Sequence, residues 1–461
     1  MSSGQSVGGD SGDAMSRAVD AYDQGELDAS RVLCEQQLRV EPSNAVALML
    51  LGLIAKRGLQ VEDAIPLLER SVRIAPNRKS LTSLADCYLR VGRLKQGLHY
   101  IDQVLAGNTD NLEALLIKAA ILHGQQKFDD ALACIDDAAR LAPESHLVEA
   151  RLGSVLAELG QYEAAEQHFQ TAARVSREAR HCGLINFRQS VWRQIAPSSA
   201  VAVADEFAHL RAPDIEAPYD AVVAACCDAR YFYKYGVTFM NSYAQNAAGG
   251  KLLHLHILDP EEGFAEHLET LIAQLGLRNV VATYEYAPVD EEPDFNLRRT
   301  FYSCARFLRM AALLAHYQKT IACFDIDTVF EAPLDELVGS VGGADIGLVR
   351  RDPPDSPWLD IVANIVIANN TAGTLRYFSA VENFIRHFVG RGKLFWHLDQ
   401  IALFCVLKMM ERFDAPPQVA PIPPSALGAV WHIGNPYEYR RAEYRVARYQ
   451  LADFAPHAKQ P

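Results

Sequence analysis

Two aspartates stand directly behind an apolar run in the stretch Ile321-Ala-Cys-Phe-Asp325-Ile-Asp327-Thr-Val-Phe330. The apolar residues predict a short buried strand that ends at Asp325. Side chains two residues apart on an extended chain point the same way, so both carboxylates can reach one point. Two carboxylates held together repel each other unless a cation lies between them. Because oxygen ligands suit Mg²⁺ or Mn²⁺, the stretch predicts metal or phosphate chemistry rather than an ordinary acidic turn.

From Tyr219 onward, short apolar runs alternate with segments of helical spacing on both sides of this stretch. Continuous apolar runs are typical of strands covered on both faces. The alternation predicts a mainly parallel sheet wrapped by helices, in which ligands bind at the carboxyl ends of the strands. Strands are expected at 221–227, 252–258, 280–286, 320–324, 345–349 and 361–368. Helices are expected at 235–247, 264–275, 303–316, 378–389 and 399–410.

Polar residues recur in a fixed order around the two aspartates. The first strand leads into an acidic turn with tyrosine and then into a helix that carries Ser and Asn. An arginine precedes the aspartates, and two Trp-His segments follow them. These segments are Asp228-Ala-Arg230-Tyr231 with Ser242 and Asn246, Cys304-Ala-Arg306-Phe-Leu, Trp396-His-Leu-Asp399-Gln400 and Ala429-Val-Trp-His432-Ile-Gly434.

In this order the segments resemble those of the family-eight glycosyltransferases, which have the Rossmann-like GT-A fold. The resemblance implies a nucleotide-sugar donor, with UDP as the expected nucleotide, and transfer with retention of configuration. It implies that Asp325, Asp327 and His432 hold Mn²⁺ or Mg²⁺, and that Asp399 and Gln400 are catalytic residues beside the anomeric carbon. The donor-binding residues that it implies are Cys226 (through its backbone), Asp228, Arg230, Tyr231, Arg306, Asp325, Ile326 and Asp327. Arg309, one helical turn after Arg306, is the alternative for the arginine.

The chain departs from the family pattern at two places. Val362-Ala363-Asn364 stands where the family has Asn-Ala-Gly near the donor sugar, and the family's Lys after the final Gly is missing after Gly434. These departures keep open a non-catalytic repeat scaffold with a degenerate nucleotide-sugar-binding domain. A third possibility is a phosphatase of the haloacid-dehalogenase type, because Asp325-Ile-Asp327-Thr-Val329 fits its motif. That motif normally opens its domain, whereas here the α/β pattern already begins at Tyr219.

The first half of the chain repeats itself with a period near 34 residues. Pro42, Pro76, Asp110 and Pro143 lie 34, 34 and 33 residues apart, with helical spacing between them. The pattern resembles the tetratricopeptide repeat, in about five copies over residues 14–177. The third copy is degenerate, with Asp86 at the position that Gly52 holds in its own copy. Such repeats stack into a curved solenoid whose concave face binds a peptide or protein, although a spacer or dimerisation arm is the alternative.

The resulting fold class is α + α/β, an α-solenoid followed by a GT-A-like glycosyltransferase domain. Residues 1–13 are expected to be disordered and 451–461 to form a tail. The repeats take 14–177, a helical connector and linker takes 178–218, with helices at 184–195 and 200–210, and the transferase takes 219–450. The solenoid would recruit a protein or glycan acceptor. A protein acceptor is favoured because a peptide-sized groove beside a transferase gives both halves a use.

The composition of the chain excludes several classes of partner and cellular location for this activity. The chain has 461 residues and a formal net charge of −13, which argues against general nucleic-acid binding. No apolar run approaches the ~18 residues of a membrane span. Nine cysteines, an odd number without CxxC pairs, argue against both a disulfide framework and a zinc site. These features predict a reduced, cytoplasmic protein that does not span a membrane.

Overall fold

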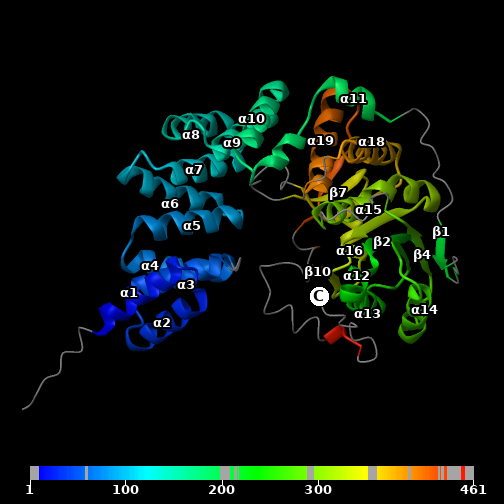
Figure 1. The fold of residues 1–461 in the computed structure, drawn as a ribbon, viewed down its shortest axis with the longest axis horizontal. Coiled ribbons are helices and arrows are strands. Elements are labelled where there is room, and N and C mark those ends of the chain that lie inside the picture. Colours follow the sequence, from blue (N-terminus) through cyan, green and yellow to red (C-terminus); the bar gives the residue numbers. More distant parts are fainter. Residues whose placement is uncertain are drawn as a thin grey trace, which may run out of the picture. The chain divides into compact units, whose positions relative to one another are not determined.

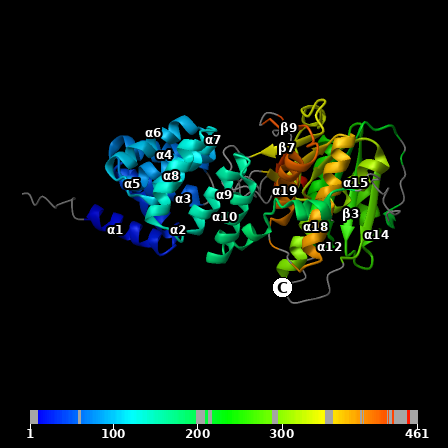
Figure 2. The same ribbon diagram turned by 90° about the horizontal axis from the view of Figure 1, so that it is seen from above.

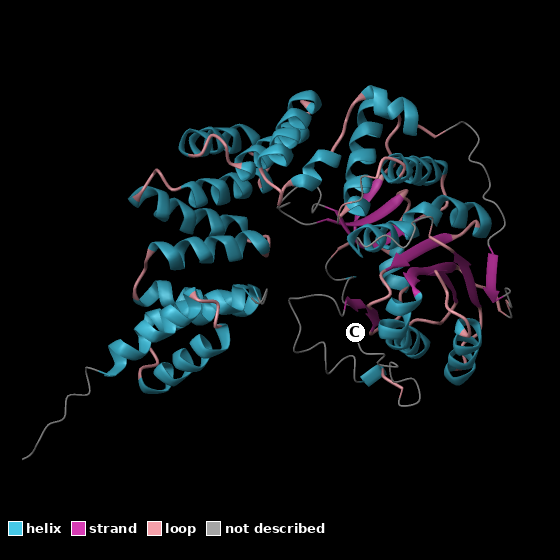
Figure 3. Ribbon diagram, viewed as in Figure 1, coloured by secondary structure: helices cyan, strands magenta, loops and turns pink. Residues whose placement is uncertain are grey.

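The computed structural model describes most of the chain in two compact units. The first unit ends at Gln161 and the second begins at Tyr162. Figure 3 shows that helices form the first unit and that the strands belong to the second. The described residues are 10–57, 61–197, 208–211, 215, 217–287, 295–350, 361–392, 395, 397–423, 426, 430–432 and 448–451.

The repeats form successive short helices of similar length. Contacts join α1 to α2, α3 to α4, α5 to α6 and α7 to α8, and each pair also contacts the helix that follows it. Figures 1 and 2 show these helices, coloured from blue to cyan, lying one beside the next. The helices are α1 (Asp10–Asp23), α2 (Leu27–Val40), α3 (Ala45–Arg57), α4 (Val61–Ile74), α5 (Arg78–Arg90), α6 (Leu94–Gly107), α7 (Leu112–Gly124), α8 (Phe128–Leu141), α9 (His146–Glu158) and α10 (Tyr162–Val175).

Three buried cores succeed one another along the stack, each built by neighbouring helices alone. This is the organisation expected of a solenoid, in which a repeat buries its apolar face only against its neighbours. The predicted helical solenoid is confirmed. Its first helix begins at Asp10, inside the segment 1–13 for which disorder was expected.

Gly52 allows α3 and α4 to approach closely. A Cβ at this position would lie 2.7 Å from Cγ of Leu68, whose side chain is fully buried. Overpacking of this kind costs about 1–3 kcal/mol, which exceeds the gain of up to about 1 kcal/mol from replacing a helical glycine by alanine. We expect Gly52→Ala to lower the melting temperature of the repeat unit, measured by circular dichroism of the full chain.

Gly107 provides the matched control for this substitution. It is the last residue of α6, and a Cβ there would meet no atom within 4 Å. Gly107→Ala should therefore leave the melting temperature unchanged or raise it. Equal melting temperatures for the two variants would show that helix packing does not require a glycine at position 52.

The second unit begins with segments that pack on its own helices. It includes α10, η1 (Arg180–Leu184) and α11 (Gln189–Ile195). Asn383 of α18 (Ala372–Val389) donates to the Ile195 carbonyl at 3.0 Å. Arg412 of α19 (Leu398–Phe413) pairs with Glu163 of α10 and donates to the Phe187 carbonyl. These contacts explain why α10 clusters with the second unit.

The helix expected at 200–210 is wrong for its last three residues, 208–210, which are not helical. Residues Ala208–Arg211 form strand β1, which pairs antiparallel with β4 (Val280–Glu285). An isolated four-residue strand carries too little pattern to be recognised, because its pairing depends on a partner far along the chain. Residues 198–207 lie outside the described part.

An eight-stranded sheet in the order β1-β4-β3-β2-β5-β8-β7-β9 forms the centre of the second unit. Strands β2 to β5 are parallel, whereas β8 is antiparallel to both of its neighbours. The sheet is mixed, but six of its eight strands run in one direction and β1 and β8 run against them, as expected of a mainly parallel sheet. Its remaining strands are β2 (Ala221–Asp228), β3 (Lys251–Leu258), β5 (Thr320–Phe324), β7 (Ile346–Arg350), β8 (Ile361–Ala368) and β9 (Val419–Pro421), and β6 (Thr328–Phe330) with β10 (Val430–His432) forms a separate pair.

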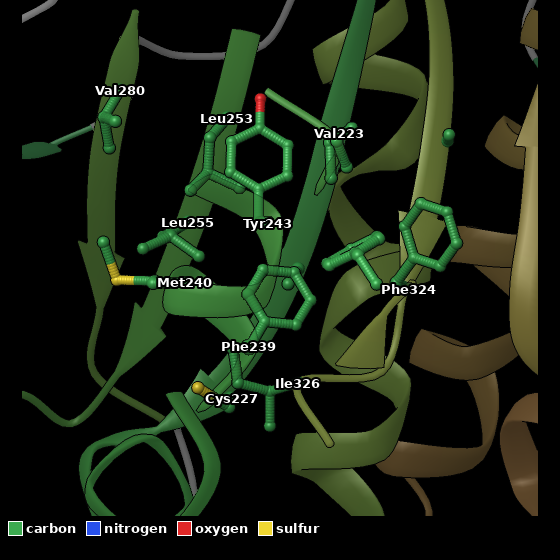
Figure 4. Close-up of a cluster of buried hydrophobic side chains, with 14 of the residues drawn as sticks. Val223, Cys227, Phe239, Met240, Tyr243, Leu253, Leu255, Val280, Phe324 and Ile326 are labelled. Atoms are coloured by element: carbon green, nitrogen blue, oxygen red, sulfur yellow. The ribbon is translucent and has the colours of Figure 1, made fainter. Parts of the chain in front are cut away.

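Helices cover this sheet, as the alternating pattern predicts. On one face, α13 (Val237–Asn246) and α14 (Phe264–Leu275) bury an apolar core against β2, β3 and β5. Figure 4 shows Phe239, Met240 and Tyr243 of α13 in this core. Helix α15 (Phe295–Tyr317) contacts strand β2 and also the helices α18 and α19. The shorter helical segments are α12 (Ala229–Tyr231), η2 (Phe232–Gly236) and α16 (Asp335–Gly339).

The cysteines serve packing. All nine are free thiols, and all except Cys226 are buried. Burial raises the pKa of the Cys405 thiol to about 12, so it stays protonated at neutral pH. Among the helices that the structure describes, none is both long enough and apolar enough to cross a lipid bilayer.

Candidate functional site

The candidate site lies where the order of the parallel strands reverses. From β2 the chain proceeds outward through β3 to β4, and it then returns to place β5 on the other side of β2. Open α/β sheets bind ligands at such a switch point, outside the carboxyl ends of the two strands. Asp228 is the last residue of β2, and Asp325 directly follows β5. Two of the predicted site residues therefore stand at this edge.

A buried arginine joins two parts of the predicted site, the aspartate after β5 and the aspartate of α19. Arg306, on α15, is 8% exposed and forms ion pairs with Asp325 and with Asp399 in the first turn of α19. Its Nη2 donates to Asp399 Oδ2 at 3.0 Å. Asp399 is itself 6% exposed, and its Oδ1 accepts from the Gln400 amide. Charges this deeply buried require partners, so the three side chains are held as a unit.

Two amide side chains near this unit have unsatisfied oxygens. The carbonyl of Asn364, on β8, accepts from the Asp325 backbone N–H at 3.1 Å, which places Asn364 beside the aspartates. Asn364 Oδ1 and Gln400 Oε1 are both buried and have no hydrogen-bond partner among the described residues. Buried acceptors of this kind are rare in native proteins and indicate a polar ligand or water. Asn364 is the residue that stands where the family pattern has glycine.

The segment after β2 forms the second part of the site. The Asp228 carboxylate accepts from the Tyr231 amide at 2.6 Å and thereby begins α12. Partial burial raises the pKa of the Asp228 carboxyl, although this hydrogen bond opposes the shift. Burial and then the negative charge of Asp327 raise the pKa of the Tyr231 hydroxyl. Tyr231 therefore lies close to Asp327, and 42% of its surface is exposed although its ring packs against that of Tyr235.

The strand that carries His432 pairs with the strand that directly follows the two aspartates. Strand β10 pairs antiparallel with β6, and His432 lies opposite Thr328, the residue after Asp327. The α13 side chains that the sequence pattern singled out support this pair. Ser242 accepts from the Phe330 amide at 3.1 Å, and Asn246 donates to the Phe330 carbonyl at 2.9 Å. Ser242 and Asn246 thus hold β6 in place rather than facing a ligand.

The resemblance assigns a divalent cation to Asp325, Asp327 and His432 at this edge. Asp325 and Asp327 are partly exposed on either side of the buried Ile326, and the β6–β10 register brings the backbone of His432 next to them. Two carboxylates and an imidazole are a donor set that Mn²⁺ accepts. Among side chains that the structure describes, no three His, Cys, Asp or Glu already form a metal-binding cluster, and the His432 side chain is not in that set.

The remaining predicted site residues differ in how far their side chains are exposed. Ile326 is 2% exposed and packs in the core shown in Figure 4, so only its backbone can touch a ligand. Cys226, on β2, lies near Arg306 and Arg309 of α15, and burial keeps its thiol protonated by raising its pKa. Arg230 is exposed beside Asp228. Gly434 lies outside the described residues.

Sequence reasoning missed a second row of ion pairs at the same edge. Asp259 follows β3 and Glu285 ends β4, so each parallel strand delivers an acid at its carboxyl end. Arg309 pairs with Glu285, and Arg298 approaches Asp259 at 3.8 Å. The helical spacing of Arg298, Arg306 and Arg309 on α15, set against acids at successive strand ends, is the signal that could have found them.

Comparisons with known proteins match the first part of the chain. The family model described as "Tetratricopeptide repeat" matches residues 15–79 and 122–180, and the model described as "Anaphase-promoting complex, cyclosome, subunit 3" matches residues 58–138. No curated protein sequence matches the chain.

Similar solved structures include other repeat proteins. MamA from Desulfovibrio magneticus is 15% identical, with a TM-score of 0.34 over 38% of this chain and 98% of its own. YrrB, described as "a TPR protein with an unusual peptide-binding site", is 18% identical, with a TM-score of 0.33 over 36% of this chain and 89% of its own. The chain thus combines tetratricopeptide repeats in its first part with a mixed α/β domain in its second.

Proposed function

We propose that this chain is a metal-dependent glycosyltransferase that moves a sugar from a nucleotide donor, UDP by resemblance, to an acceptor recruited by the repeats. One observation carries the proposal. Arg306 ties Asp325 of the metal motif to Asp399 of the implied catalytic pair, although the two aspartates are 74 residues apart. The resemblance assigned these residues to one site, and a shared buried partner is the arrangement expected if it is right.

The position of each side chain at the site suggests which part of the donor it would contact. The exposed ring of Tyr231 would stack on the base, and Asp228 and Arg230 would contact the nucleoside. Arg306 would meet the donor while keeping Asp325 and Asp399 in position. Gln400 and Asn364, with their unsatisfied oxygens, would accept hydrogen bonds from sugar hydroxyls. Asn364 replaces the family's glycine, so it would alter the choice of sugar.

In the proposed reaction the bond between the anomeric carbon and the diphosphate oxygen breaks and UDP leaves. An acceptor oxygen forms the new bond to the anomeric carbon, and its proton passes to the departing diphosphate. The anomeric carbon becomes cation-like on the way. Asp399 and Gln400 would stabilise that charge, and the fixed Arg306 unit would orient the donor before the bond breaks. A bound Mn²⁺ or Mg²⁺, held by Asp325, Asp327 and His432, would neutralise the charge that develops on the departing diphosphate.

Tetratricopeptide repeats indicate a protein partner for this activity. If the partner is itself the acceptor, the activity is protein glycosylation. If the acceptor is a glycan, the repeats dock the enzyme on another protein.

Release of UDP from UDP-sugars tests the proposal. We expect the full chain with Mn²⁺ to release UDP from at least one UDP-hexose. Because a metal supplies several kcal/mol of charge stabilisation, EDTA should reduce the rate by about 10²-fold or more. Added Mn²⁺ in excess of the chelator should restore it.

Two other outcomes separate the alternatives. Hydrolysis of p-nitrophenyl phosphate without UDP release would identify a phosphatase instead. Nucleotide binding without turnover on any donor would identify the scaffold with a degenerate donor domain.

A further inference from the structure

A pocket of about 590 Å³ lies in the repeat unit, separate from the residues of the α/β site. It is lined by α1, α3, α5 and the start of α7, which are the first helices of four successive pairs. Its volume is within the range of sites that enclose a ligand or several side chains of a peptide.

Positive charge dominates this pocket although the chain as a whole is acidic. Its lining includes five cationic residues and one carboxylate, Glu113. Even when the acids that pair with lining cations, Asp23 and Asp86, are counted, five positive charges face three negative ones. The chain carries a net charge of −13, so this excess is a local feature. The five cations are Lys56, Arg57, Arg78, Lys79 and Arg90.

Asp86 fixes part of this charge in place. Lys56 and Arg90 pair with its carboxylate at 2.7 and 3.0 Å. Burial alone would raise the pKa of Asp86, but the two cations outweigh it and lower the pKa, so the carboxylate stays ionised. Asp86 is the residue that departs from the glycine of the repeat pattern. The departure thus supplies the anchor for two cations of the pocket.

The other three cations of the pocket, Arg57, Arg78 and Lys79, have weaker carboxylate partners or none among the described residues. Arg57 and Lys79 both lie near the face of the Tyr22 ring, at 5.3 and 5.1 Å from its centroid. Arg78 is exposed, and no carboxylate of the described residues lies within ion-pair distance of it. An exposed guanidinium that lines a pocket and has no carboxylate partner is available for an incoming anion.

A buried hydroxyl completes the set of donors. Thr82, in the pocket lining, is only 4% exposed, and its Oγ1 has no hydrogen-bond partner among the residues described. A threonine inside a helix usually donates to the carbonyl four residues back. An unsatisfied buried hydroxyl instead indicates that a ligand or water supplies the acceptor.

We propose that this pocket binds an acidic peptide segment, whose Asp or Glu carboxylates pair with Arg78 and its neighbouring cations and accept from Thr82. Buried Leu53 and the Tyr22 ring offer apolar contact to the intervening residues. The proposal holds whether or not the α/β domain is an enzyme, because it concerns the repeat unit alone.

A peptide fits the pocket better than a nucleic acid does. Nucleic-acid binding draws its affinity from many phosphate contacts spread along a strand. Here the cations converge on one pocket, and three acids stand among them. Carboxylates at alternate positions of an extended peptide match such a compact group of charges.

Fluorescence anisotropy with the full chain tests this inference, without donor or metal. The probe is a fluorescein-labelled peptide of about ten alternating Glu and Gly residues, which spans roughly 33 Å when extended. The Gln-Gly counterpart should bind at least about tenfold more weakly, since charge complementarity drives the binding. Affinity for the Glu peptide should also fall as salt is raised.

Matched charge reversals locate the binding site. Arg78→Glu should weaken binding of the Glu peptide about tenfold or more. Arg73→Glu makes the same charge change on an exposed residue of α4 that does not line the pocket, and should change affinity by no more than about twofold at physiological salt. Thr82→Val, which keeps the shape of the side chain, should weaken binding about tenfold through loss of a hydrogen bond to a charged group.

Several results would overturn the inference. They are equal binding of the Glu and Gln peptides, no binding of either, and equal effects of Arg78→Glu and Arg73→Glu. Tighter binding of a thymidine oligonucleotide of the same length would assign the pocket to nucleic acid instead. Circular dichroism of each variant confirms that loss of binding is not loss of folding.

Discussion

Asp327→Asn is expected to abolish metal-dependent release of UDP. The substitution keeps the size of the side chain and removes one of the two charges that would hold the cation. Metal affinity of an oxygen site depends on the number of charged ligands. Since each 1.36 kcal/mol of lost stabilisation reduces the rate tenfold, loss of a charged ligand should lower turnover by about 10²-fold or more. The rate of UDP release at saturating Mn²⁺ measures the effect.

Asp335→Asn is the matched control. Asp335 is an exposed carboxylate of the same unit, at the start of α16, and pairs with Lys251 at 2.8 Å. Lys251 keeps a second partner in Asp220, so the variant should fold and retain wild-type turnover. A 10²-fold loss in Asp327→Asn together with unchanged Asp335→Asn would tie the loss to the site. Equal activity of both variants would remove Asp327 from the mechanism.

Arg306→Met is expected to have the second large effect, on both stability and turnover. The substitution leaves Asp325 and the buried Asp399 without their common partner. Removing one member of a buried ion pair costs about 3–5 kcal/mol because the other charge stays buried. Turnover should also fall, because Arg306 both positions the two aspartates and would meet the donor. Urea unfolding and UDP release measure the two effects.

The double variant Arg306→Met/Asp399→Asn separates them. Neutralising Asp399 removes the unpaired charge, so the double variant should recover about 1–3 kcal/mol of stability relative to Arg306→Met. It should not recover turnover. Arg309→Met is the second comparison. Arg309 pairs with Glu285 rather than with the aspartates, so this variant should retain Mn²⁺-dependent UDP binding. The Arg306 account fails if Arg306→Met turns over donor at the wild-type rate.

Much of the α/β unit could be predicted from the sequence because its strands are buried on both faces. The strands Thr320–Phe324 and Ile361–Ala368 and the helix Phe264–Leu275 have the predicted bounds. Strand direction could not be predicted, since a continuous apolar run reads the same in a parallel or an antiparallel neighbour. The sequence pattern therefore identified β8 as a strand but missed that it runs against β5 and β7.

Reasoning from the residues alone could predict the candidate site only where residues are close in sequence, and the distant members, such as Asp399, came from the family resemblance. The spacing of Asp325 and Asp327 behind a strand predicts that both serve one ligand. The choice between Arg306 and Arg309 was open, because it depends on the rotation of α15 over the sheet. In the structure that rotation sets Arg306 against Asp325 and Arg309 against Glu285. The resemblance placed Asn364 near the donor sugar, but its contact with Asp325 and its unsatisfied oxygen could not be predicted, because they follow from an antiparallel pairing.

In the repeat unit the fold could be predicted from the sequence, whereas the pocket could not. Its period of about 34 residues identifies the fold at once. Its pocket depends on residues that break the pattern, such as Asp86. A departure from a repeat consensus reads as degeneracy in sequence, whereas in the structure it places a carboxylate between Lys56 and Arg90.

Calorimetric titration of UDP into the full chain, with and without Mn²⁺, tests the central claim most directly. The proposed donor site predicts binding to the wild type that requires Mn²⁺ and that disappears in Asp327→Asn while Asp335→Asn is unaffected. Absence of UDP binding under both conditions, or equal binding by wild type and Asp327→Asn, would contradict it.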